Sequence, residues 1–126
     1  MSAQSFTPTA YVKDGCPFSF KFLTFAAETG LLGDLNIVRV RDGDANADTT
    51  KQMLSEKLGK PATFPTVEIE PGRYMTDSDK LIEHYAHRAD VSPDELQLLS
   101  FYKQTILPKL FEHYKLTSGA KSAAKN

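Results

Sequence analysis

Hydrophobic and polar positions follow two different spacings in the first part of the chain. Thr9 to Lys13 and Leu35 to Val40 are short runs rich in β-forming residues, whereas Phe18 to Thr29 between them has helical periodicity. Pro17 suits the first turn of this helix, and Gly30 suits its end. Because a helix separates two short strands, the pattern predicts a parallel β-α-β unit with neighbouring strands.

A second helix and a hairpin are predicted next. Residues 49–58 have apolar side chains at helical spacing, and Gly59-Lys60-Pro61 ends this helix. Thr66 to Glu70 alternates between apolar and polar side chains, and Arg73 to Met75 offers a return strand. Pro71-Gly72 is a turn signal, so these two strands form a hairpin.

A third helix is predicted after the hairpin. Thr76 with Asp79 forms a capping-box pattern, which opens a helix over Asp77 to His87. The order of elements is then βαβαββα.

A long C-terminal helix is predicted over residues 92–116. Ser92 is a good capping residue, and Pro93 suits the first helical position. Pro108 should kink this helix or remove one backbone hydrogen bond. Residues 117–126 are predicted to be disordered. One apolar stripe must be buried, either on the domain itself or in a dimer: Leu96, Leu99, Tyr102, Ile106, Leu110 and Tyr114.

The first helix is rich in phenylalanine, and its four phenylalanines cannot all face one side. Phe22 and Phe25 make the better core stripe. Phe18 is then expected near the residues before the helix, and Phe20 is expected to be partly exposed.

Composition narrows the class of protein. The 126 residues, 40% hydrophobic and 25% charged, fit one globular domain. The net charge of −1, with both signs scattered, argues against nucleic acid or an anionic membrane as a partner. No apolar run approaches the roughly 20 residues of a membrane span, and residues 1–8 lack the layout of a signal peptide, so we expect a cytoplasmic protein.

Cys16 is the only cysteine and the strongest candidate for chemistry. It follows Asp14-Gly15 and precedes Pro17, so it should lie in a loop at a helix start. The helix dipole and the free N–H groups of the first turn favour a thiolate there, and Lys13 adds a nearby cation. The alternative is a buried cysteine acting as a small hydrophobe. A lone cysteine cannot form an intramolecular disulfide, so a redox cycle needs an outside thiol.

Three short motifs follow one another: Lys-x-x-Cys-Pro-Phe-Ser at 13–19, Phe-Pro-Thr at 64–66 and Thr-Asp-Ser-Asp at 76–79. Together they resemble glutaredoxins and the amino-terminal domains of cysteine-type glutathione transferases. Cys-Pro-Phe-Ser is similar to the motif of plant dehydroascorbate reductases and intracellular chloride-channel proteins. The resemblance covers about residues 8–88. It implies an α/β, thioredoxin-like βαβαββα fold, here followed by the long C-terminal helix over 92–116.

The resemblance implies roles for residues near Cys16, the catalytic residue. Lys13 would bind the glycyl carboxylate of glutathione, and Phe18 would line the ligand site. Ser19 stands where dithiol glutaredoxins have a second thiol, and a hydroxyl cannot close a disulfide. Its hydroxyl would bond either a local N–H group or the Cys16 sulfur. The alternative for Lys13 is a solvated charge at a strand end.

The resemblance also implies glutathione contacts farther along the chain. Pro65 would be a cis proline facing the cysteine, and the Phe64 backbone would bond the cysteinyl part of glutathione. Asp77 and Ser78 would bind the γ-glutamyl ammonium and carboxylate. The alternatives are an ordinary strand-start proline and helix capping without a ligand. No metal site is predicted, because no cysteine or second cluster accompanies the histidines, His84, His87 and His113.

The leading hypothesis for function is a glutathione-dependent oxidoreductase that acts on thiol or disulfide substrates by a monothiol route through Cys16. Deglutathionylation and dehydroascorbate reduction would share this chemistry, with glutathione as cosubstrate. A glutathione transferase is a weaker alternative, because its acceptor pocket lies largely on a helical second domain that we do not expect here. A third alternative is a non-catalytic glutathione-binding or interaction module, for example a homodimer through the C-terminal helix. Iron–sulfur binding is remote, because monothiol glutaredoxins that do this have glycine where Pro17 stands.

Overall fold

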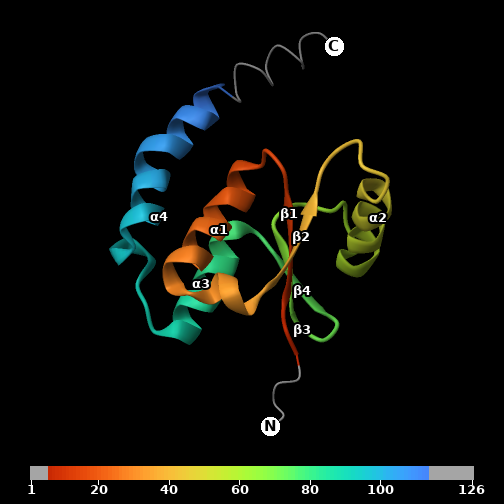
Figure 1. The fold of residues 1–126 in the computed structure, drawn as a ribbon, viewed down its shortest axis with the longest axis horizontal. Coiled ribbons are helices and arrows are strands. Elements are labelled where there is room, and N and C mark those ends of the chain that lie inside the picture. Colours follow the sequence, from red (N-terminus) through yellow and green to blue (C-terminus); the bar gives the residue numbers. More distant parts are fainter. Residues whose placement is uncertain (1–5, 114–126) are drawn as a thin grey trace.

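A four-stranded mixed sheet forms the centre of the computed structural model, which describes residues 6–113 (Figure 1). The strand order is β2-β1-β3-β4, where β1 is parallel to β2 and antiparallel to β3, and β3 is antiparallel to β4. This is the thioredoxin-like topology expected from the sequence, including the parallel β-α-β unit. The strands are β1 (Thr9–Lys13), β2 (Asn36–Val40), β3 (Thr66–Glu70) and β4 (Arg73–Thr76).

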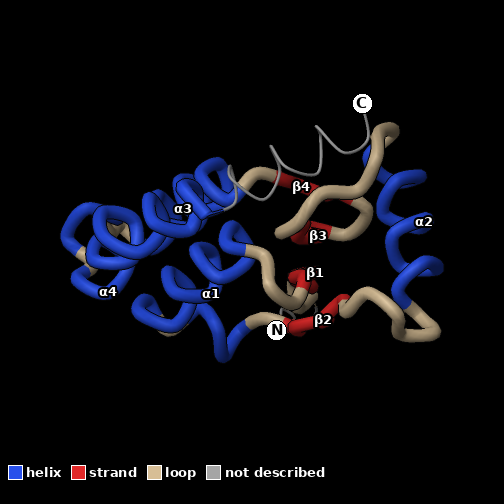
Figure 2. The backbone as a smooth tube through the Cα atoms, turned by 90° about the horizontal axis from the view of Figure 1, so that it is seen from above, coloured by secondary structure: helices blue, strands red, loops and turns tan. Residues whose placement is uncertain are grey.

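Helices cover both faces of the sheet (Figure 2). Helices α1 (Pro17–Thr29) and α3 (Ser78–Ala89) lie on one face, and α2 (Ala47–Leu58) lies on the other. Helix α4 (Gln97–Phe101) opens the C-terminal helix, which continues without a break to residue 113 and packs against the outer side of α1. A short 3-10 helix, Leu31–Asp34, connects α1 to β2. Within residues 6–113, no helix is long and apolar enough to cross a bilayer.

The main core lies between the sheet and the α1–α3 layer. As expected from the helical pattern, Phe22 and Phe25 are fully buried, whereas Phe18 is 37% and Phe20 54% exposed. Alternation along the strands turns their apolar side chains toward these helices. The fully buried cluster also contains Ala10, Ala26, Val67, Leu81 and Leu99.

The start of α3 differs from the predicted capping box. Thr76 is the last residue of β4, and Asp77 is the N-cap. The Asp77 carboxylate accepts hydrogen bonds from the backbone N–H groups of Asp79 at 3.0 Å and Lys80 at 3.4 Å. Because α3 begins at Ser78, the N-cap position falls on Asp77, and Thr76 lies one residue before it, in the strand.

The C-terminal helix begins later than predicted. Pro93–Glu95 forms a 3-10 turn, Ser92 makes no capping hydrogen bond, and α4 starts at Gln97. Its first turn is capped from α1, because the Glu28 carboxylate accepts the N–H groups of Leu98 at 2.9 Å and Leu99 at 2.7 Å. A carboxylate at this position also complements the helix dipole.

A π-helical turn, Tyr102–Ile106, changes the register within the C-terminal helix. The Leu107 N–H group bonds the Tyr102 carbonyl, five residues earlier, and the helix then continues over 107–113. This wider turn directly precedes Pro108, which has no N–H group and whose ring would clash with the carbonyl four residues before it.

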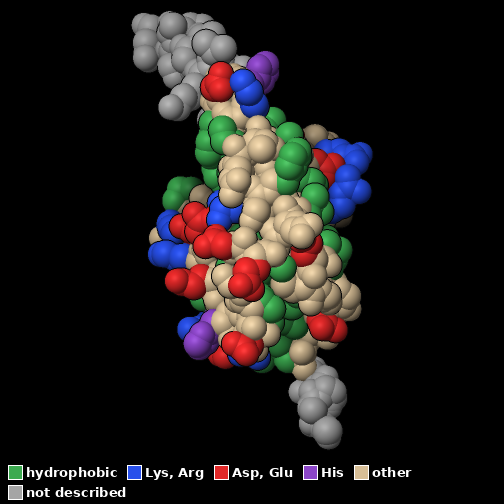
Figure 3. All heavy atoms as spheres, turned by 90° about the vertical axis from the view of Figure 1, so that its left-hand side faces the viewer, with side chains coloured by type: hydrophobic (Ala, Val, Ile, Leu, Met, Phe, Trp, Pro, Cys, Tyr) green, Lys and Arg blue, Asp and Glu red, His purple; other side chains and the backbone are tan. Residues whose placement is uncertain are grey.

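Because of the π turn, the buried positions of the C-terminal helix differ from the predicted apolar stripe. Leu99 and Tyr102 are buried as expected, but the next buried residue is Leu107 at 7% exposure, five positions after Tyr102. Ile106 is 41% and Leu110 37% exposed. Hydrophobic side chains are visible among polar ones on the face formed by α4 (Figure 3). Tyr114 and the predicted tail 117–126 lie outside the described residues.

We predict that Leu99→Ala lowers the free energy of unfolding by about 2–5 kcal/mol, because it leaves a cavity in the core. Its neighbour Leu98 is 54% exposed, so Leu98→Ala should change stability by no more than about 0.5 kcal/mol. Urea unfolding followed by far-UV circular dichroism measures both, since the chain has no tryptophan. Equal values would contradict the packing of α4 on the domain core.

Candidate functional site

Cys16 is the N-cap residue of α1, directly after β1 and a turn at Gly15. Gly15 has φ +80°, which L residues adopt only with strain. The Cys16 Sγ accepts the Ser19 N–H group at 3.4 Å and lies 3.7 Å from the Phe64 carbonyl oxygen, to which the thiol donates. The side chain is partly exposed. Cys16 is therefore available for chemistry and is not part of the buried core.

Ser19 supports the loop that carries the cysteine. Its side chain is 2% exposed, and its Oγ accepts the backbone N–H group of Lys13 at 3.1 Å. Of the two roles expected for the hydroxyl, the structure shows the bond to a local N–H group. The Cys16 sulfur is bonded by the backbone of Ser19 instead.

The Phe64–Pro65 peptide bond is cis and lies beside the cysteine. Pro65 is fully buried, and β3 begins at the next residue, Thr66. The Thr66 hydroxyl donates to the Thr63 carbonyl at 2.6 Å and closes the turn before the strand. The backbone of Phe64 is thus held opposite the start of α1.

A polar pocket of about 420 Å³ lies between the start of α1 and the start of α3. Among its lining residues are Phe18, Phe64, Asp77 and Ser78, all predicted as site residues. Asp77 has φ +78° and Ser78 is 4% exposed. The structure therefore brings together the motifs at 13–19, 64–66 and 76–79.

Lys21 also lines this pocket, although the sequence did not predict it as a site residue. It is 5% exposed, its Nζ lies 2.7 Å from Asp79 Oδ1, and it lies 5.7 Å from the centre of the Phe18 ring. The sequence did contain a pattern that could have predicted its burial. Lys21 is three residues after Phe18 and four before Phe25, and this spacing places it on the same side of the helix as both.

Lys13 lies on the other side of the cysteine and is part of an ion-pair cluster. Its Nζ is 3.2 Å from Asp42 Oδ2, and Lys51 contacts the other oxygen of Asp42 at 2.6 Å. Hydrogen bonds from Lys51 and then from Lys13 lower the pKa of Asp42 below its usual value. Lys13 is therefore near Cys16 but already shares a carboxylate.

An apolar groove of about 480 Å³ begins at Cys16 and runs between α1, β2 and the part of the C-terminal helix that follows α4. We expected little surface for an acceptor pocket in this chain, but residues that follow α4 line this apolar groove beside Cys16. Its walls include Cys16, Phe20, Leu23, Ile37, Arg39, Tyr102, Ile106 and Leu110.

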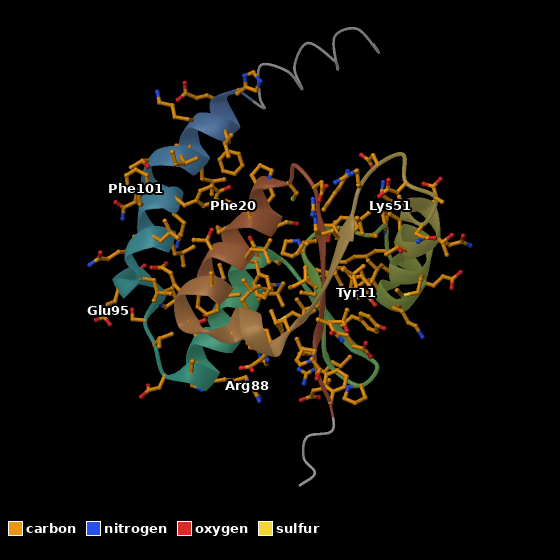
Figure 4. The ribbon with its side chains drawn as sticks, in the orientation of Figure 1. Tyr11, Phe20, Lys51, Arg88, Glu95 and Phe101 are labelled. Carbon is orange, nitrogen blue, oxygen red and sulfur yellow. The ribbon has the colours of Figure 1, made fainter. Side chains whose placement is uncertain are left out.

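Tyr102 joins α4 to the cysteine loop, and no motif pointed to it. Its hydroxyl donates to the Pro17 carbonyl at 2.7 Å, and its ring packs edge-to-face on Phe20 at 4.9 Å. Burial and then negative charge at Cys16 raise the pKa of Tyr102 above its usual value. Figure 4 shows Phe20 between α1 and α4, and Phe101 on the outer side of α4.

These contacts give a single thiol at a helix start, between a polar pocket and an apolar groove. Such a thiol can attack a disulfide or stand beside a bound thiol ligand. Within the described part of the chain, no three His, Cys, Asp or Glu residues are arranged to hold a metal ion.

No protein-family model matches the sequence, and no curated protein matches it. Solved structures do resemble the fold. A possible glutathione S-transferase from Rhodopseudomonas palustris is 22% identical, with a TM-score of 0.58 over 86% of this chain and 57% of its own. A glutathione S-transferase from the Antarctic clam Laternula elliptica is 14% identical, with a TM-score of 0.58 over 96% and 54%.

A third similar structure contains a ligand. It is a glutathione transferase homologue from Sulfitobacter with bound glutathione, 22% identical, with a TM-score of 0.53 over 89% of this chain and 49% of its own. The chain thus spans about half the length of these proteins. At these identities, the likeness establishes the thioredoxin-like fold.

We predict that Ser19→Ala lowers stability by about 1–2 kcal/mol, because the Lys13 N–H group loses its acceptor in a partly buried site. Ser100→Ala is the matched control. It removes an exposed hydrogen bond to the Asp94 carbonyl and should cost no more than about 0.5 kcal/mol. Urea unfolding compares the two; a Ser19→Ala protein as stable as the control would show that this hydroxyl does not hold the loop.

Proposed function

We propose that the protein is a glutathione-dependent thiol-disulfide oxidoreductase that works by a monothiol route through Cys16. The observation that carries this proposal is the partly exposed Cys16 sulfur at the N-cap of α1, which accepts the Ser19 N–H group beside Phe64. The N–H bond and the helix dipole both stabilise negative charge on the sulfur. The bound glutathione in the Sulfitobacter homologue of the same fold supports glutathione as the ligand.

In this proposal, glutathione occupies the polar pocket with its sulfur at Cys16. The γ-glutamyl group meets Asp77 and the start of α3 at Ser78, where backbone N–H groups and the helix dipole favour a carboxylate. The Phe64 backbone bonds the cysteinyl part, and Phe18 forms a wall. Lys13 would exchange part of its contact with Asp42 for the glycyl carboxylate.

The reaction consists of two thiol–disulfide exchanges. The Cys16 thiolate attacks the glutathione sulfur of a mixed disulfide, so a Cys16–glutathione disulfide forms, the substrate disulfide breaks and the substrate leaves as a thiolate that takes up a proton. The thiolate of a second glutathione then attacks the glutathione sulfur of this intermediate. Oxidised glutathione leaves, and the Cys16 thiolate is restored. Ser19 cannot compete, because it has no thiol.

A glutathione transferase is the second candidate, and the apolar groove favours it. Transfer requires an apolar site beside the ligand thiol, and the groove lies there. The glutathione thiolate would attack an electrophilic carbon, form a carbon–sulfur bond and displace a leaving group with its electron pair. Product analysis separates the two reactions, because only this one yields a thioether.

We predict that Cys16→Ser reduces the glutathione-coupled reduction of a glutathionylated peptide to the uncatalysed rate. Serine is also a good N-cap, so the variant should keep the circular dichroism of the natural protein. Mass spectrometry of the natural protein should show one glutathione bound through a disulfide. Unchanged turnover in the serine variant would refute the proposal.

We predict that Asp77→Asn raises the KM for glutathione about tenfold, because the variant loses a charge that contacts the γ-glutamyl ammonium. Asparagine caps helices as well as aspartate and tolerates positive φ, so stability should stay within about 0.5 kcal/mol. An unchanged KM would assign Asp77 to capping alone.

A further inference from the structure

We propose that the apolar groove binds the part of the substrate other than glutathione, and that it selects an apolar group carrying a carboxylate. This inference rests on the proposed function, because it places a glutathione sulfur at Cys16. Arg39 of β2 is the residue that recognises the carboxylate.

Cys16 lies where the pocket and the groove meet. Its sulfur is 3.7 Å from the carbonyl oxygen of Phe64, which lines the polar pocket, and Cys16 itself lines the groove. A molecule bound in the polar pocket with its sulfur at Cys16 therefore directs its sulfur substituent toward the groove. The volume of about 480 Å³ is in the range of small-molecule sites.

The groove offers apolar surface that the fold leaves open. Ile37 is 37%, Ile106 41% and Leu110 37% exposed, although all three are large aliphatic residues. They belong to β2 and to the helix that starts with α4, and Leu23 of α1 also lines the groove. An aromatic or aliphatic substituent would cover this surface and gain free energy from burial.

The positive charge at the groove is incompletely neutralised. Arg39 donates two hydrogen bonds to Asp14, each 3.0 Å long, and Arg41 donates to the same carboxylate at 2.9 Å. One carboxylate therefore serves two guanidinium groups. In the adjacent cluster, Lys13 and Lys51 likewise share one carboxylate, that of Asp42.

Arg39 is available to a ligand. Its side chain is 64% exposed and lines the groove, and a guanidinium has five N–H donors, of which Asp14 takes two. An anionic group at the open side of the groove would thus meet donors and a local excess of positive charge, in a chain whose net charge is −1. A neutral group would gain only the apolar contacts.

Calorimetric titration with two conjugates, S-(4-carboxybenzyl)glutathione and S-(4-methylbenzyl)glutathione, tests the inference without requiring turnover. The natural protein should bind the carboxylate about threefold to fivefold more tightly, as for an exposed ion pair. Arg39→Gln should abolish this preference, so that the variant binds the two conjugates with equal affinity. Arg73→Gln is the matched control, because Arg73 is 61% exposed on β4 in a surface ion pair with Glu70. It should keep the preference.

Raising the ionic strength should reduce the preference of the natural protein, because the charges are exposed. Equal affinities for the two conjugates, or a preference that survives Arg39→Gln, would overturn the inference and leave the proposed function intact. If neither the conjugates nor glutathione itself bind, the proposed function fails and the inference fails with it.

Discussion

The Glu28 carboxylate at the end of α1 holds the first turn of α4, and the arrangement of the site depends on this contact. Two short hydrogen bonds from Leu98 and Leu99 end on it, and hydrogen bonds to charged groups are among the strongest in proteins. At the other end of α1, the Tyr102 hydroxyl bonds the Pro17 carbonyl, next to the cysteine. The C-terminal helix is thus attached to both ends of α1. This attachment holds in place the side of the groove that Tyr102, Ile106 and Leu110 form.

Helix α1 also connects the cysteine to the end of the polar pocket at the start of α3. The Lys21 ammonium is buried, whereas its partner Asp79 at the start of α3 has a side chain that is 73% exposed. The buried charge is stabilised by one carboxylate and the face of Phe18. One helix therefore sets the position of the thiol relative to both the polar pocket and the groove, because residues of α1 line both of them.

Local patterns predicted the strands, the ends of α1 and the cysteine site, because each depends on residues close in sequence. Pro17 and Gly30 act through their own backbone preferences, and they placed α1 to within one residue. The start of α4 could not be predicted in this way, because its cap comes from Glu28, about seventy residues earlier. Lys21 was missed for a similar reason: its partner lies on another helix. Arg39 was not predicted either, because its place in the groove lining depends on how β2 lies relative to α1 and the C-terminal helix.

The π turn at Tyr102–Ile106 changes which side chains of the continuous C-terminal helix face the domain core. One additional residue turns the following side chains by about 100° around the helix axis. Leu99 before the turn and Tyr102 at its start are buried, whereas Ile106 at its end and Leu110 after it are more exposed. Ile106 and Leu110 line the groove together with Tyr102. The turn therefore leaves Ile106 and Leu110 outside the buried core and in the lining of the groove. These two positions can change in size and polarity while the attachment of the helix to the domain through Glu28, Leu99 and Tyr102 is preserved.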